Sequence, residues 1–140
     1  MIVRTLDEIL GGDRHVRGEG WESRRILLRA DRMGFSLHDT VLAEGTEQLL
    51  EYKNHLEANY CIGGKGEVVD VATGETFPIQ PGTLYALDRN DRHILRAIAG
   101  ELRLVCVFNP ALTGSEVHGP DGSYSAAAAA AAAAEPESGE

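Results

Sequence analysis

Two short segments of this chain carry side chains of the types that do chemistry in proteins. The first, YKNHLEANYCI at residues 52–62, contains Tyr52, His55 and Glu57 and runs into the glycine-rich stretch GGKG. The second, PGTLYALDRNDRH at residues 81–93, contains Tyr85 and ends at His93. Residues of these types serve as metal ligands or as general acids and bases. Each also has an ordinary explanation, because a strand tyrosine usually packs and a histidine after a turn is usually solvated.

The elements that must position these residues are predicted to be short strands. Apolar runs recur between glycine, proline and asparagine breaks, a spacing typical of a sandwich or barrel. One short helix is expected at residues 6–10, where two glycines follow. The chain is therefore predicted to be all-β, a single small closed barrel. The expected strands cover residues 25–30, 34–42, 57–62, 67–71, 76–79, 83–87, 94–98 and 102–108.

Alternation along these strands predicts which side chains share a face. Positions two apart point the same way, so Cys106 and Phe108 share one face and His38 and Thr40 share another. Several strands thus carry polar groups on one face and apolar groups on the other. The polar face is either exposed to solvent or lines the interior of the barrel, and alternation alone does not decide between them.

Length, charge and cysteine content exclude several classes of protein. The 140 residues suit one domain, which we expect to span residues 1–120, followed by an alanine-rich, disordered or frayed tail at 121–140. A net charge of −9 argues against binding to nucleic acids or anionic membranes, because both attract basic surfaces. No signal peptide or membrane span is evident, so Cys61 and Cys106 are expected to be free thiols in a cytoplasmic protein.

The two segments resemble the two half-motifs of the cupin superfamily. Glu57 falls at the glutamate position of the first motif, and His93 falls at the histidine position of the second. The usual first-motif histidines are missing, which argues against a cupin oxygenase. This depleted pattern resembles the ectoine synthase family, as do MIVR, GWESRRILL, MGFS and CVFNPALTGSEVH. The resemblance covers residues 1–120.

The resemblance implies an enzyme that cyclises N-γ-acetyl-L-2,4-diaminobutyrate to ectoine, with loss of water, in compatible-solute biosynthesis. It implies that Fe(II), or Zn(II) or another divalent transition metal, is held by Glu57, Tyr85 and His93. Acid–base roles are implied for Tyr52, Glu116 and His118, with the acid and the base left open. Substrate contacts are implied for Trp21, Arg25, Thr40, His55, Cys106 and Phe108. The Arg25 guanidinium suits the substrate carboxylate.

Two other readings compete with this one. A non-catalytic cupin that binds a small ligand would need the pocket but no acid and base. A cupin oxygenase would need two or three histidines in the first motif, which are absent. The role of His38 stays open. We expect a homodimer, since cupins commonly pair through edge strands.

Overall fold

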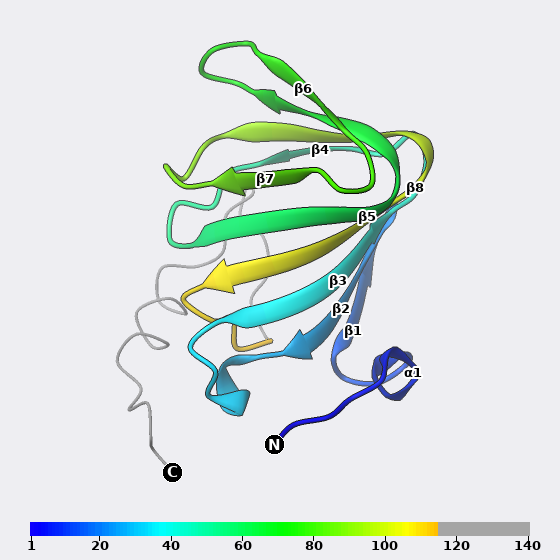
Figure 1. Ribbon diagram of the computed structural model, residues 1–140, viewed down its shortest axis with the longest axis vertical. Coiled ribbons are helices and arrows are strands. Elements are labelled where there is room, and N and C mark those ends of the chain that lie inside the picture. Colours follow the sequence, from blue (N-terminus) through cyan, green and yellow to red (C-terminus); the bar gives the residue numbers. More distant parts are fainter. Residues whose placement is uncertain (115–140) are drawn as a thin grey trace.

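The computed structural model describes residues 1–114, and the predicted residues Glu116 and His118 and the tail at 121–140 lie outside this range. Strands dominate it (Figure 1). In chain order the elements are α1 (Leu6–Ile9), β1 (His15–Gly18), β2 (Trp21–Leu27), η1 (Arg29–Asp31), β3 (Ser36–Leu42), β4 (Glu47–Leu50), β5 (Leu56–Asp70), β6 (Thr76–Ile79), β7 (Leu84–Leu87) and β8 (His93–Asn109).

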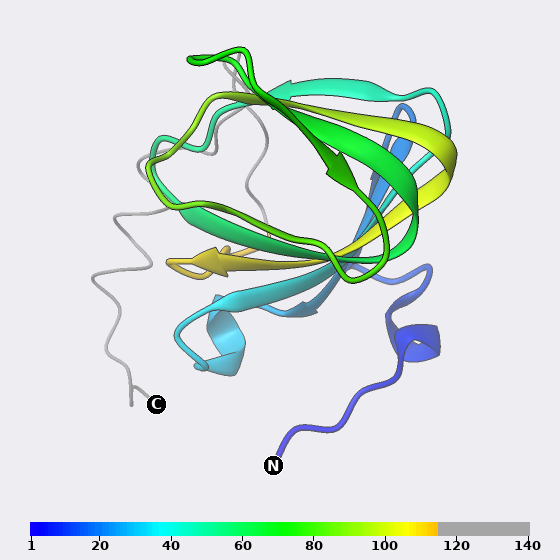
Figure 2. The same cartoon turned by 45° about the horizontal axis from the view of Figure 1, so that its top comes forward.

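Two long strands, β5 and β8, run side by side through the whole molecule and organise the barrel (Figure 1). The first part of β5 and the last part of β8 belong to a layer with β1, β2, β3 and β7. Their other halves belong to a layer with β4 and β6. Figure 2 shows the strands curving around a common interior. The prediction of an all-β barrel is thereby confirmed.

The glycine-rich stretch at 63–66 is a bend within β5. The sequence predicts separate strands at 57–62 and 67–71, and at 94–98 and 102–108, and this prediction is wrong because β5 and β8 each continue through the break. β5 continues through the bend with shifts in its pairing to β8. Gly64 has φ +74°, and an added Cβ would overlap the carbonyl oxygen of Glu101. Because only glycine has no Cβ, it lets the two backbones approach closely enough to curve together.

Other departures from the predicted elements are local. The helix is confirmed at Leu6–Ile9. The strand expected at 25–30 instead spans Trp21–Leu27, and a 3-10 turn follows it. The short strands β1 and β4 were missed because each contributes few apolar residues to the core. No helix within residues 1–114 is long and apolar enough to cross a membrane.

The polar faces of β3 and β5 point into the barrel. Leu102, Leu104, Cys106 and Phe108, which share one face of β8, are all buried. His38 is buried on the interior face of β3 and packs against Phe108, with ring centroids 5.2 Å apart. The barrel therefore encloses polar groups together with its apolar core, and such groups are retained where they are paired or used.

An ion-pair cluster beside the N-terminal segment should make stability depend on pH. The nearly buried Asp31 carboxylate binds Arg4 and Arg14, each at 2.7 Å. Burial raises its pKa, but these hydrogen bonds outweigh burial and hold the pKa well below its ordinary value. The stabilisation is thus present above the unfolded-state pKa of about 3.9 and is lost as pH falls. We expect Asp31→Asn to cost about 2 kcal/mol at neutral pH and progressively less as pH falls below about 4, measured by urea unfolding.

Candidate active site

A cavity of about 50 Å³ lies inside the barrel between the two layers of strands. Its walls come from β2, β3, β4, β5, β7 and β8 and from the segment before β5. The combination of apolar walls and a few polar groups is typical of a small-molecule site. The lining residues are Trp21, Ser23, His38, Thr40, Leu42, Gln48, Leu50, Tyr52, Glu57, Asn59, Tyr85, Leu95, Leu104, Cys106 and Phe108.

Glu57 and Tyr85 come from neighbouring strands and both line the cavity. In the pairing of β5 with β7, Asn59 lies opposite Tyr85 and Glu57 lies opposite Leu87. Burial raises the pKa of Glu57 to about 8, and the Asn59 side chain opposes this only partly. Burial, and then the charge of Glu57, raise the pKa of the Tyr85 phenol well above its ordinary value. Within residues 1–114 no cation pairs with Glu57.

His93 begins β8 and is almost completely buried. Its Nδ1–H donates to the carbonyl oxygen of Asp91 at 2.8 Å. That bond fixes the tautomer and leaves the Nε2 lone pair without a partner among the described residues. Burial lowers the pKa of the imidazole, which favours its neutral form. A neutral imidazole oriented through its other nitrogen is the usual form of a metal-binding histidine.

A second space adjoins the cavity at Tyr85. This cleft of about 330 Å³ is lined by residues of β5, β6 and β7, the loop after β7, and His93. Tyr85 lines both spaces, and its ring centroid lies 6.5 Å from that of His93. Tyr85 therefore separates the cavity from the cleft, and His93 lies on the cleft side.

The donor set Glu57, Tyr85 and His93 fits a divalent transition metal. No group of three or more histidine, cysteine, aspartate and glutamate side chains in the described part of the chain is arranged to hold one. The predicted set has only two such residues, and its third member is a phenol. Two observations favour a metal at this set: the buried Glu57 carboxyl has no cation beside it, and the His93 Nε2 has no partner among the described residues. A bound cation would stabilise the ionised forms of Glu57 and Tyr85.

Tyr52 and His55 precede β5 and pack at the aromatic end of the cavity. Tyr52 meets Phe108 edge to face at 5.1 Å and lies 6.1 Å from His93, measured between ring centroids. His55 also meets Phe108 edge to face, at 6.1 Å. The Asn90 side chain donates to the carbonyl oxygens of Tyr52 and His55, at 2.8 and 3.1 Å. The loop after β7 thus holds this segment against the cavity.

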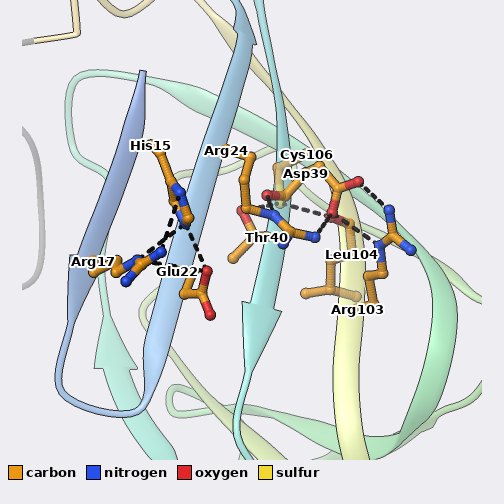
Figure 3. Close-up of polar contacts among 9 residues, drawn as sticks. All are labelled: His15, Arg17, Glu22, Arg24, Asp39, Thr40, Arg103, Leu104 and Cys106. Carbon is orange, nitrogen blue, oxygen red and sulfur yellow. Dashed lines mark hydrogen bonds and ion pairs between the residues drawn. The ribbon is translucent and has the colours of Figure 1, made fainter. Parts of the chain in front are cut away.

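Arg24 and Arg25 are adjacent on β2 but point to opposite faces. Arg24 lies on the outer face, where Arg24 and Arg103 both form ion pairs with Asp39 (Figure 3). Arg25 shares the interior face with Trp21 and Ser23 and is 3% exposed. Its Nη1 donates to the carbonyl oxygen of Gly114 at 2.9 Å. No carboxylate within residues 1–114 pairs with this buried guanidinium.

Cys106 and Thr40 form one wall of the cavity. The Cys106 thiol donates to the Thr40 hydroxyl oxygen at 3.5 Å (Figure 3). Burial, and then the charge of Glu57, raise the pKa of the thiol well above its ordinary value. A thiol that stays protonated is a poor nucleophile, so Cys106 shapes the wall rather than attacking substrate. Cys61 is also buried and free.

Most of the predicted site residues lie on this cavity. The predicted residues that line it are Trp21, Thr40, Tyr52, Glu57, Tyr85, Cys106 and Phe108. His93 lines the adjoining cleft, and Arg25 is buried beside Gly114. Sequence reasoning missed the lining residues Ser23 and Asn59. The alternation of side chains along a strand indicates both, since each shares a face with a predicted site residue two positions away.

Comparisons with known proteins place the chain in one family. The family model described as ectoine synthase matches residues 1–128. An L-ectoine synthase from Desulfatibacillum aliphaticivorans is 64% identical over 126 residues, which cover 89% of this chain and 96% of the relative. The crystal structure of ectoine synthase from P. lautus is 54% identical, with a TM-score of 0.81 over 87% of each chain. The cupin domain of Schizosaccharomyces pombe Cnp3, 14% identical, matches in fold alone with a TM-score of 0.58, covering 69% of this chain and 67% of that one.

Proposed function

The chain belongs to the ectoine synthase family, and on this basis we propose that it closes N-γ-acetyl-L-2,4-diaminobutyrate into ectoine with release of water. The observation that carries the proposal is the buried cavity on which Glu57, Tyr85 and Phe108 converge, with His93 beside it. A site set inside the barrel supports a condensation, because it limits contact with bulk water, which would favour the reverse reaction.

The reaction joins two ends of one flexible molecule. The α-amino nitrogen bonds to the acetamide carbon, and the carbonyl oxygen leaves as water with two protons taken from nitrogen. The amine must therefore be neutral and the chain must fold back on itself. A small rigid cavity between Trp21 and Phe108 supports the folded conformation and removes much of the entropic barrier to ring closure.

Arg25 is proposed to bind the substrate carboxylate. A buried guanidinium without a carboxylate partner in the described part of the chain is costly unless a ligand supplies the negative charge. Guanidinium and carboxylate pair through two parallel hydrogen bonds, which also fix orientation. With the carboxylate held at β2, the acetamide end of the substrate would extend toward β5, β7 and β8.

Glu57, Tyr85 and His93 are proposed to hold Fe(II), with Zn(II) or another divalent transition metal as alternatives. When bound, such a cation supplies Lewis acidity that polarises a carbonyl oxygen. Tyr52 is proposed as a proton donor or relay, because its phenol lies on the cavity near His93. Glu116 and His118 are proposed to exchange protons with the amine and the departing oxygen.

The decisive assay follows the mass of the product. Incubation of the reduced protein with Fe(II) and N-γ-acetyl-L-2,4-diaminobutyrate is expected to give a product lighter than the substrate by one water. A ligand-binding cupin would return the substrate unchanged, and an oxygenase would consume oxygen and add mass. Either of these results would contradict the proposed function. Protein without added metal serves as the control.

Two further proposals concern the protein's state in the cell. We propose a cytoplasmic location, which the two free buried thiols support. We also propose a homodimer. An apolar surface groove lined by Ile2, Ile26, Met33 and Leu37, with Met33 half exposed, offers a face that a second copy could cover.

A further inference from the structure

A chain of hydrogen bonds crosses the interior of the barrel through His38. This histidine is 1% exposed and lines the cavity from β3. Its Nε2 lies 3.1 Å from the Ser36 hydroxyl, and its Nδ1 lies 3.2 Å from the Ser23 hydroxyl on β2. The Ser36 oxygen also accepts the backbone N–H of Leu112 at 3.1 Å. Four groups from β2, β3 and the segment after β8 are thus joined in series.

The direction of this chain follows from counting donors and acceptors. Ser36 is fully buried, and among the described residues its hydroxyl contacts only Leu112 and His38. Leu112 donates to it, so the Ser36 hydrogen has one available acceptor, the Nε2 of His38. A neutral imidazole that accepts at Nε2 carries its hydrogen at Nδ1. The Nδ1–H of His38 then donates to Ser23, because the reverse direction would leave the buried Ser36 hydrogen without an acceptor, which is costly.

His38 stays neutral over the whole physiological range. Burial, and then the charge of Arg25, lower its pKa to about 3. The ring therefore acts as a fixed donor and acceptor rather than as an acid or a base. A single tautomer can be maintained because the Leu112 N–H, which cannot reverse its role, sets the start of the chain.

The series of hydrogen bonds ends in the cavity, at Ser23. Ser23 accepts from His38 and has no other hydrogen-bond partner among residues 1–114, so its own hydrogen is directed at whatever fills the cavity. Ser23 and Arg25 share the interior face of β2, two residues apart, about 7 Å along the strand. A ligand carboxylate held by Arg25 would therefore lie on the same face of β2 as a hydroxyl donor whose orientation is already set.

We propose that Ser36 and His38 are positioning residues, which orient the Ser23 hydroxyl as a hydrogen-bond donor to the substrate carboxylate beside Arg25. The identity of the substrate rests on the proposed function, whereas the direction of the hydrogen bonds does not. The same hydrogen bonds connect Leu112 to the wall of the cavity, and Leu112 belongs to the segment that Arg25 binds at Gly114. Preorganised donors of this kind bind a ligand at lower entropic cost.

The direction of the chain can be measured without turnover. In protein labelled with ¹⁵N-histidine, NMR is expected to show His38 with Nδ1 protonated and Nε2 unprotonated from about pH 5 to pH 8, its signals identified by their loss in His38→Gln. Ser36→Ala removes the donor to Nε2 and should release this tautomer. A wild-type His38 protonated at Nε2, or one that titrates in this range, would overturn the proposal whether or not the protein is an ectoine synthase.

Kinetics test the consequence for binding. Ser36→Ala and His38→Leu are expected to raise KM about 3- to 10-fold with kcat little changed, and His38→Gln, which keeps one donor and one acceptor, should recover most of the loss. Thr46→Val is the matched control, because it deletes a hydroxyl bonded to the Gly20 carbonyl outside the cavity. A fall in kcat at constant KM would refute the carboxylate as the partner of Ser23. An equal rise in KM in Thr46→Val would show that the hydrogen bonds through His38 have a purely structural role, which would overturn the proposal.

Discussion

Replacing Glu57 with glutamine is expected to abolish metal binding and turnover while leaving the metal-free fold intact. Loss of an outer hydrogen-bond partner of a ligand already costs about 10- to 100-fold in metal affinity, so loss of a ligand should cost at least about 100-fold. The same is expected of His93→Ala. Metal content by elemental analysis should fall from one per chain to near zero. Glu67→Gln is the matched control, because Glu67 is a partly exposed carboxylate on the same strand that pairs with Arg96.

Stability distinguishes a ligand from a structural residue at position 57. Burial without a partner cation raises the pKa of Glu57 to about 8, so ionisation is costly in the folded, metal-free protein. That cost is absent below the unfolded-state pKa of about 4.3 and grows as pH rises toward the folded value. Metal-free Glu57→Gln should therefore be at least as stable as the metal-free parent near pH 8. A variant that melts earlier yet still binds one metal would contradict the assignment.

The sequence allowed the interior of the barrel to be predicted in part. A period of two correctly placed Cys106 with Phe108 and His38 with Thr40, because strand geometry leaves no freedom in which side chains share a face. It did not decide whether the polar face was inside or outside. That depends on how the layers close, and closure depends on pairings between β5 and β8 that are far apart in the sequence.

Glycine caused the main error in the fold. The sequence predicts two strands on either side of GGKG instead of one, since glycine marks turns and strand bends alike. Gly64 in fact allows the close approach of β5 to Glu101 that bends both long strands. Periodicity also carries no information on partners across strands. The bonds of His38 to Ser23 and Ser36 thus emerged only from the three-dimensional arrangement.

Arg25→Met is expected to lower kcat/KM by about 10- to 100-fold, mainly through KM, because a buried charge-assisted pair contributes about 1.5–3 kcal/mol. The loss should be specific for the carboxylate. Wild-type protein should bind the substrate far more tightly than its α-carboxamide analogue, and the variant should bind the two about equally. Arg25→Lys should recover only part of the difference, since an ammonium cannot form the paired bonds of a guanidinium.

Arg24→Met is the control that the fold itself provides. The two arginines are neighbours in the sequence, yet Arg24 faces outward and binds Asp39 at 2.7 Å (Figure 3). Its loss leaves a nearly buried carboxylate with only Arg103, so the melting temperature should fall while KM stays constant. Arg25→Met removes a buried charge that has no carboxylate partner within residues 1–114, so it should affect KM far more than stability. If both variants lose stability and neither discriminates between acid and carboxamide, then Arg25 is structural and the carboxylate binds elsewhere.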